Sequence, residues 1–158
     1  SSSSAASDVY KRQGADGSNP TLLHQPAGGS SQPATEYTIA NRQHFLKMNG
    51  KEIFKSAVRV MEKATRELLT ENDLDIEDVD HVIPHQANVR IVESMAQRLE
   101  IPMNKFFCNL DRHGNTSAAS IPLALDEAVK KGLFKEDELA VLVAFGAGLT
   151  WSATLVRF

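Results

Sequence analysis

The pattern of hydrophobic and polar positions becomes regular from Asn49 onward. Apolar side chains recur at helical spacing between Ile53 and Leu68, which predicts a helix over about 49–69. Asn49 can cap this helix, and Glu52 follows three residues later, as in a capping box. The regular part of the chain is therefore predicted to begin with a long amphipathic helix.

Short apolar runs and helical patterns then alternate to the end of the chain. We expect, in chain order, a helical turn at 76–79, a strand at 81–83, a helix around 92–99, a strand at 106–110, a helix at 117–131 and strands at 139–145 and 150–158. The unbroken apolar run at 139–145 is typical of a central strand that is covered on both faces. The alternation indicates a layered α/β fold, with a mixed sheet between helical layers.

The first 48 residues lack this regularity. Residues 1–13 are serine-rich and then basic, and we expect a disordered tail or a segment foreign to the protein. Residues 14–33 are rich in glycine and proline, which predicts loops with a brief strand around 21–24. A long loop usually packs on something else, so we expect the chain to start in the middle of a larger structure.

Composition and charge narrow the class of protein. A chain of 158 residues that is 42% hydrophobic can form one domain with a core. The formal net charge of −3 argues against binding to nucleic acid. The sequence contains no apolar stretch of membrane-spanning length and no signal-peptide pattern, so a cytoplasmic protein is expected. The single cysteine, Cys108, excludes an internal disulfide.

Two polar clusters follow predicted strands. The cluster PHQAN at 84–88 comes after the run at 81–83, and DRHGNTSAAS at 111–120 comes after the run at 106–110. In open α/β sheets, functional groups gather beyond the carboxyl ends of the strands. We therefore predict that the two clusters form one site.

His85 and Asn115 are the candidate catalytic residues of these clusters. A neutral His85 imidazole can act as a base or as a donor to an oxyanion, although it could instead cap the following helix. Asn115 can stabilise charge without accepting a proton, but an Asx turn ahead of Ser117 would explain it equally well. A polar turn is costly to bury without a purpose, which favours a functional role for His85.

Other kinds of chemistry find less support in the sequence. His81 and His85 are four residues apart, but Pro84 argues against a shared helical face that could bind metal. Cys108 lies in an apolar run, where an inert thiol is expected rather than a nucleophile. The turn at 146–148 lacks the third glycine of a dinucleotide fingerprint. We expect neither a metal ion nor a cofactor.

Three motifs in this order resemble the C-terminal half of β-ketoacyl-acyl-carrier-protein synthase III. They are PHQAN at 84–88, HGNTSAAS at 113–120 and GAGLTW at 146–151. Residues 1–13 match nothing in that family. The resemblance implies a thiolase-like layered fold in a homodimer. Residues 14–48 would then be the end of the N-terminal half with connecting loops, and 49–158 the C-terminal thiolase-like domain.

The resemblance also implies an activity. The family condenses a short acyl-CoA, such as acetyl-CoA, with malonyl-acyl carrier protein by decarboxylative Claisen condensation, which starts fatty acid synthesis. Its Cys-His-Asn triad would make His85 and Asn115 the donors that stabilise the enolate. The nucleophilic cysteine that carries the acyl group belongs to the N-terminal half, and Cys108 is not on its motif. This chain alone is therefore expected to be inactive.

Five further residues acquire roles through the same resemblance. Ala87 and Asn88 would line the pantetheine tunnel, and Phe145 would border the site. The Ala147 backbone N–H would join the acyl oxyanion hole. Arg90 would meet the acidic carrier protein.

Two positions depart from the family pattern, and two other functions stay open. Ala147 and Ser152 stand where glycine is usual, which we expect to narrow the acyl pocket without removing a backbone N–H. The chain could belong to a condensing enzyme of secondary metabolism on the same fold, or it could be a non-catalytic domain that pairs with an active subunit. The presence of both His85 and Asn115 argues against the non-catalytic domain.

Overall fold

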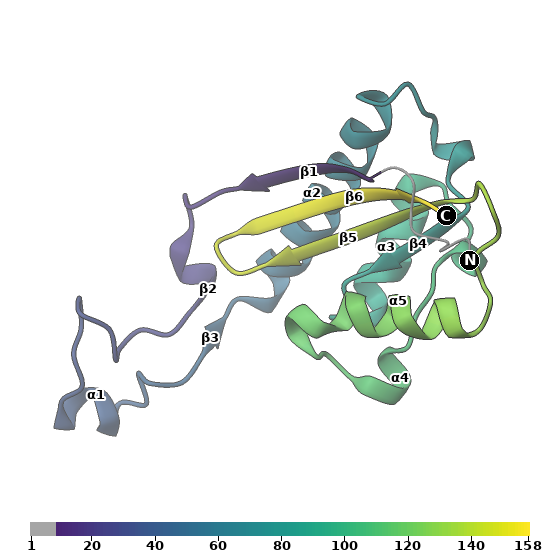
Figure 1. Ribbon diagram of the computed structural model, residues 1–158. Helices are drawn as coiled ribbons and strands as arrows, with labels where there is room; N and C mark the ends of the chain where they lie inside the picture. Colours follow the sequence, from purple (N-terminus) through teal and green to yellow (C-terminus); the bar gives the residue numbers. More distant parts are fainter. Residues whose placement is uncertain (1–8) are drawn as a thin grey trace.

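A computed structural model describes residues 9–158, which form a mixed four-stranded sheet with helices on both faces (Figure 1). The helices and strands are β1 (Val9–Ala15), β2 (Leu23–His24), α1 (Glu36–Ala40), β3 (Lys47–Met48), α2 (Gly50–Thr70), β4 (His81–Pro84), α3 (Val89–Leu99), α4 (Leu110–His113), α5 (Ser120–Lys130), β5 (Leu139–Gly146) and β6 (Thr150–Arg157). Single 3-10 turns lie at Pro20–Leu22, Ile76–Asp78, Met103–Lys105 and Ser117–Ala119.

The sheet has the strand order β1-β6-β5-β4. Strands β4 and β5 are parallel, whereas β6 runs antiparallel to both of its neighbours, β5 and β1. Strand β5 has a neighbour on each side, and its Ala140, Val141 and Val143 are fully buried. The prediction that the run at 139–145 is a central strand is confirmed.

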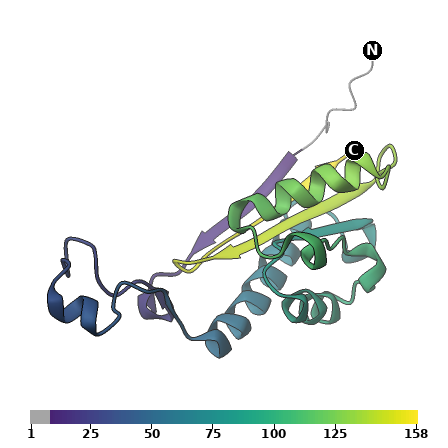
Figure 2. The ribbon, with the colours of Figure 1, turned by 90° about the horizontal axis from the view of Figure 1, so that it is seen from below.

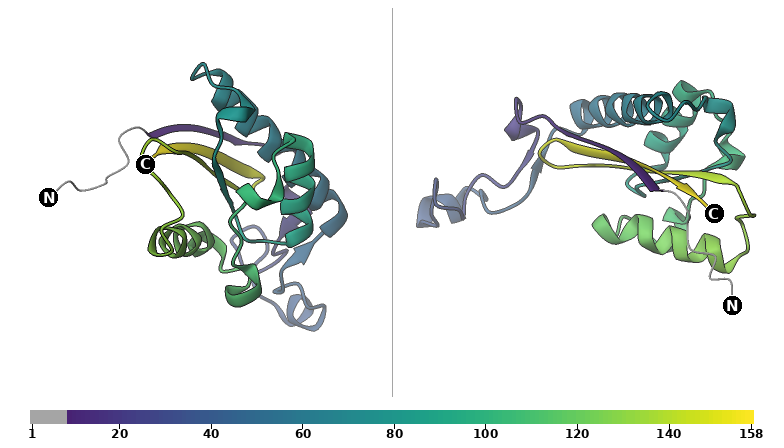
Figure 3. Two further views of the ribbon diagram at one scale, coloured as in Figure 1. Left: turned by 90° about the vertical axis from the view of Figure 1, so that its right-hand side faces the viewer. Right: turned by 45° about the horizontal axis from the view of Figure 1, so that its top comes forward.

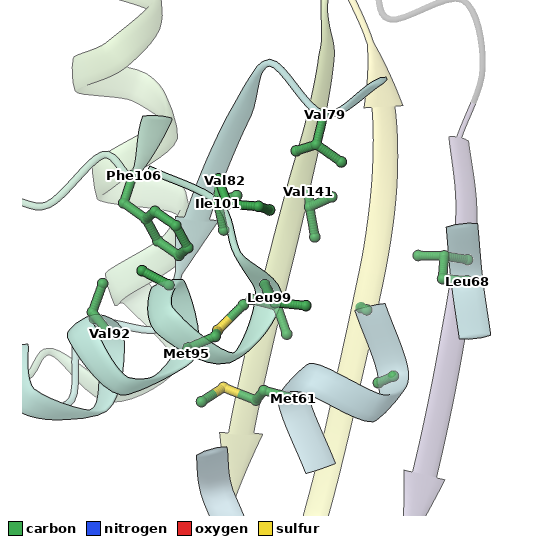
Figure 4. Packing of buried hydrophobic residues seen from close by; sticks show 14 of the residues in the cluster. Met61, Leu68, Val79, Val82, Val92, Met95, Leu99, Ile101, Phe106 and Val141 are labelled. Carbon is green, nitrogen blue, oxygen red and sulfur yellow. The ribbon is translucent and has the colours of Figure 1, made fainter. Parts of the chain in front are cut away.

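Helices α2 and α3 cover one face of the sheet (Figure 3). The side chains that recur at helical spacing in α2 are buried, and the Asn49 Oδ1 atom accepts a hydrogen bond from the Glu52 N–H at 3.3 Å, so the predicted helix and its cap are confirmed. Apolar residues of α2, α3, β4 and β5 form one large cluster, in which Met61, Met95, Leu99 and Val141 lie close together (Figure 4). This cluster is the main core.

Helix α5 lies on the opposite face of the sheet (Figure 3). Only its inner side is covered, where Ala124 and Ala128 pack with Ile83 of β4. On its outer side, the Leu123 side chain is 39% exposed and Val129 is 53% exposed. The first half of this helix, residues 118–125, is almost wholly apolar, a pattern typical of a helix buried between layers, but its outer side is not covered within residues 9–158.

The segment between β1 and α2 forms an arm that projects from the sheet (Figure 2). Strands β2 and β3 pair antiparallel at its base, so the brief strand predicted around 21–24 is confirmed at Leu23–His24. The outer part of the arm carries α1 and exposes large apolar side chains, among them Tyr37, Phe45 and Leu46. No other segment within residues 9–158 covers these side chains.

Residues 9–13 correct one expectation. They were predicted to belong to a tail that is either disordered or foreign to the protein. Disorder is wrong for them, because they form most of β1, which pairs with β6 from Val9–Val156 to Ala15–Thr150, whereas a foreign origin of residues 1–13 stays a prediction. An open strand edge pairs through backbone N–H and C=O groups, so this pairing does not require a particular sequence. Residues 1–8 lie outside the described residues, and the boundary between 14–48 and 49–158 stays a prediction.

The run at 106–110 corrects a second expectation, because it is not a strand. It touches β4 only at one isolated bridge, Val82–Phe106, and through a hydrogen bond from the Phe107 N–H to the Val82 carbonyl at 2.9 Å. The chain then turns away into α4, which begins at Leu110. The Asn109 backbone N–H donates its hydrogen bond to the buried side-chain amide of Gln86 rather than to a neighbouring strand.

Candidate active site

Strand β4 and helix α3 position His85 in the short turn between them. Pro84 cannot donate a backbone hydrogen bond, but the His85 N–H donates to the Val143 carbonyl of β5 at 2.7 Å. Asn88 then caps α3, since its Oδ1 atom accepts from the Arg90 N–H at 2.9 Å. The imidazole therefore lies at the carboxyl end of the parallel pair β4–β5, where the sequence placed it.

The amide of Gln86 ties the segment 107–109 to this turn. It is 1% exposed. Its Nε2 group donates to the carbonyls of Pro84 at 2.7 Å and Phe107 at 3.3 Å, while its Oε1 atom accepts from the Asn109 N–H at 3.1 Å. Gln86 was not among the predicted site residues, although its place inside the polar turn at 84–88 was a signal for it.

The second polar cluster is a short helix followed by a turn, rather than a strand-to-helix turn. Helix α4 ends at Gly114, whose φ of +67° lies in the left-handed region that glycine adopts without strain. The exposed Asn115 then accepts a hydrogen bond from the Ser117 N–H on its Oδ1 atom at 3.0 Å. This Asx turn leaves the two side-chain N–H groups of Asn115 available to a ligand.

The two clusters meet at Ser120, the first residue of α5. Its Oγ atom lies 2.5 Å from Nδ1 of His85 and 3.3 Å from the backbone nitrogen of Gln86. The segment 115–120 is thereby held against the His85 turn. Ser120 belongs to the predicted cluster at 111–120, but no pattern in the sequence distinguishes it from its neighbours there.

Burial shifts the pKa values of two titratable side chains near this turn, His85 and Cys108. It lowers the pKa of the half-buried His85 imidazole, so the ring is neutral at pH 7. It raises the pKa of the Cys108 thiol, and the nearby Asp111 carboxylate adds to that effect. A neutral imidazole can donate a hydrogen bond to a developing oxyanion, whereas a protonated thiol is a poor nucleophile.

A charged network fastens α4 to α5 beneath Asn115. The Glu127 carboxylate accepts hydrogen bonds from Lys131 Nζ at 2.6 Å, Asn109 Nδ2 at 3.0 Å and Arg112 Nη2 at 2.5 Å. These donors, the lysine first, lower the pKa of Glu127 to about 2. The carboxylate is therefore ionised at neutral pH and holds both ends of the Asn115 segment.

The other predicted site residues lie around the same edge of the sheet. Ala87 and Phe145 are half-buried and pack against the main core. Asn88 and Arg90 are exposed at the start of α3, and Arg90 forms no ion pair within residues 9–158. Ala147 lies in the exposed turn beyond Gly146, the last residue of β5 that pairs with β6, so its N–H is outside the ladder.

The described residues contain neither a cluster of metal ligands nor a helix of membrane-spanning character. No group of three or more His, Cys, Asp or Glu side chains in residues 9–158 is arranged to hold a metal ion. None of the helices in that range is both long and apolar enough to cross a membrane.

The mixed sheet between helical layers, with polar turns at its edge, is the arrangement expected of a thiolase-like fold, and the solved structures that superpose on it confirm this class. Within that class, the family model described as "3-Oxoacyl-[acyl-carrier-protein (ACP)] synthase III C terminal" matches residues 69–158. The chain belongs to this family, and the resemblance stated from its motifs is confirmed.

Curated relatives and solved structures agree with this assignment. The β-ketoacyl-[acyl-carrier-protein] synthase III of Natranaerobius thermophilus is 54% identical over 145 residues, which is 92% of this chain and 44% of that protein. The crystal structure of 3-oxoacyl-[acyl-carrier-protein] synthase III from Aquifex aeolicus superposes with a TM-score of 0.82 at 44% identity, and the match covers 99% of this chain and 46% of that one. The chain thus spans less than half the length of these two proteins.

Proposed function

We propose that this chain is the C-terminal half of an enzyme that condenses a short acyl-CoA, such as acetyl-CoA, with malonyl-acyl carrier protein. The observation that carries the proposal is the neutral His85 imidazole, which Ser120 holds against the segment that contains Asn115. Both side chains can donate hydrogen bonds without a net charge, which suits the stabilisation of a developing oxyanion.

The proposed reaction has two stages. A cysteine thiolate from the N-terminal half attacks the acyl-CoA carbonyl, coenzyme A leaves as its thiolate, and an acyl-enzyme results. Malonyl-acyl carrier protein then loses carbon dioxide, and the electrons of the broken bond pass to the thioester oxygen. His85 and Asn115 donate to that enolate oxygen. The enolate carbon attacks the acyl-enzyme carbonyl, and the cysteine thiolate is expelled.

The remaining predicted residues would bind the substrates of this reaction. Ala87 and Asn88 would line the tunnel for the pantetheine arm, and Phe145 would border the reacting atoms. The Ala147 N–H, which the β5–β6 ladder does not use, would donate to the acyl carbonyl oxygen. Arg90 would bind the acidic carrier protein. The proposed enzyme acts as a cytoplasmic homodimer and uses no cofactor.

A condensing enzyme of secondary metabolism is the second candidate. The priming β-ketosynthase of a polyketide biosynthetic pathway superposes on this chain with a TM-score of 0.74 at 32% identity. The two candidates would use His85 and Asn115 in the same way and would differ in the acyl primer. A comparison of acetyl-CoA with longer acyl-CoA primers separates them.

The test uses a full-length chimera, in which residues 14–158 follow the N-terminal half of the Natranaerobius relative. His85→Ala and Asn115→Ala should each slow malonyl-acyl carrier protein decarboxylation by about 10²–10³, the usual cost of one oxyanion donor. Acyl transfer to the cysteine should be largely retained.

The matched controls are His81→Ala, at the opposite end of β4, and Asn104→Ala, in an exposed turn. Both should decarboxylate at the rate of the parent chimera. A site variant that also keeps the parent rate would show that its residue is not a donor to the enolate.

A further inference from the structure

The Ser120 hydroxyl is enclosed by the two residues that it joins. The serine is 2% exposed. Its Oγ atom has two hydrogen-bond partners within residues 9–158, the Gln86 backbone N–H at 3.3 Å and the His85 Nδ1 atom at 2.5 Å. It is therefore shielded from bulk water and depends on these two groups for its hydrogen bonds.

Only one assignment of protons satisfies every hydrogen bond among Ser120, Gln86 and His85. A backbone N–H can only donate, so Ser120 Oγ accepts the bond from Gln86. The hydroxyl proton then needs an acceptor, and His85 Nδ1 is the one available to it in the described part of the chain. Nδ1 must consequently be unprotonated. A neutral imidazole carries one proton, which is then on Nε2.

The opposite arrangement leaves a group unsatisfied. If Nδ1 carried the proton and donated it to Ser120 Oγ, the buried hydroxyl proton would have no acceptor within residues 9–158. A buried donor without a partner is destabilising. Burial also favours the neutral ring over the doubly protonated one, which could not accept from the serine.

We infer that Ser120 is a positioning residue that holds His85 in the Nε2–H tautomer, so that the ring presents an N–H donor to a substrate carbonyl oxygen. In the other tautomer, Nε2 would present a lone pair and repel that oxygen. The identification of the oxygen as that of the malonyl thioester rests on the proposed function, whereas the tautomer itself does not.

The tautomer can be observed directly by nitrogen NMR of the full-length chimera. A protonated and an unprotonated ring nitrogen differ strongly in chemical shift, and a His85→Gln variant identifies the His85 signals. At neutral pH we expect His85 to carry its proton on Nε2. A spectrum with the proton on Nδ1 would overturn the inference.

Variants of Ser120 separate a positioning role from a packing role. Ser120→Ala should shift His85 toward a mixture of tautomers and slow malonyl decarboxylation at least tenfold, with a smaller effect on acyl transfer. Ser120→Thr keeps the hydroxyl and should restore both readouts. Ser120→Ala with the parent tautomer and parent rate would overturn the inference.

The matched control is Thr65→Val, which removes a fully buried hydroxyl on α2 that has no hydrogen-bond partner within residues 9–158. It should leave the tautomer and the rate unchanged, and thermal unfolding of every variant checks that the fold is intact. A parent chimera that shows the Nε2–H tautomer but no decarboxylation would contradict the proposed function and leave the inference standing.

Discussion

The two faces of the sheet are covered to very different degrees. On one face, α2 and α3 bury a continuous apolar cluster that includes Met61, Met95 and Leu99. On the other face, α5 buries little more than Ile83, Ala124 and Ala128, and its outer side exposes Leu123. Within residues 9–158, the core on one side of the sheet is fully covered, whereas the other side is covered only in part.

Asn115 and Ser120 belong to the segment on the less covered side, and His85 lies at the edge of the sheet, in the turn between β4 and α3. Ser120 begins α5 and Asn115 precedes it, whereas Arg90 lies in the first turn of α3 on the covered side. Under the proposed function, the segment that stabilises the enolate belongs to the part of the fold that the N-terminal half would complete. The carrier-protein contact belongs to the part that is already complete. Four predictions test this division.

The largest effect is expected for the chain alone. Under the proposed function the nucleophilic cysteine comes from the N-terminal half, so the chain alone should form no acetoacetyl-acyl carrier protein from acetyl-CoA and malonyl-acyl carrier protein. The full-length chimera should form it under the same conditions. Product from the purified chain alone would show that this chain catalyses the reaction without the N-terminal half.

A matched pair of leucine truncations measures the coverage of each face. Leu99 is fully buried, so Leu99→Ala should cost about 2–5 kcal/mol of unfolding free energy in both the chain and the chimera. Leu123→Ala should cost less than about 0.5 kcal/mol in the chain, as exposed substitutions do, and clearly more in the chimera. Urea denaturation gives these values. An equal cost of Leu123→Ala in both proteins would mean that the N-terminal half does not cover α5.

Arg90 tests the covered side. A cation in the first turn of a helix is locally unfavourable, and this one has no ion pair within residues 9–158, so an external anion explains it better than helix stability does. Arg90→Glu in the chimera should raise the KM for malonyl-acyl carrier protein several-fold. The KM for acyl-CoA should change less, and added salt should reduce the difference. Equal changes for both substrates would identify an ordinary solvated arginine.

The smallest effect concerns the Glu127 network. The pKa of Glu127 is lowered in the folded state to about 2, so its contribution to stability is present above the ordinary carboxyl pKa and is lost as pH falls toward 2. The stability difference between the parent and Glu127→Gln should therefore be constant near neutral pH and shrink between about pH 4.5 and 2. Urea denaturation across this range measures it. A difference that does not change with pH would exclude a contribution from the ionised carboxylate.

Local periodicity was sufficient to predict the elements that bury a continuous apolar side. Helix α2 and strand β5 have the expected bounds to within about one residue, because their patterns directly reflect what covers them. The strand expected at 106–110 was wrong because the Gln86 side chain takes the place of a strand neighbour. No periodic pattern can reveal a tertiary contact of this kind.

The candidate site was predictable in its location and not in its connections. The motifs placed His85 and Asn115 at one edge of the sheet, but the bond that joins their segments comes from Ser120, thirty-five positions after His85. Residues 9–13 show the opposite case. Their composition indicated disorder, whereas the open edge of β6 provides backbone partners that side chains do not specify.

Gln86 restricts both substitution and motion at the site. Its amide makes three hydrogen bonds, as donor to Pro84 and Phe107 and as acceptor from Asn109. Glutamate at this position would set a carboxylate against two carbonyl oxygens, and leucine would leave all three backbone groups unpaired. Neither equal size nor equal polarity is therefore enough to replace it. The turn that carries His85 and the segment 107–109 are thereby tied together through a single side chain.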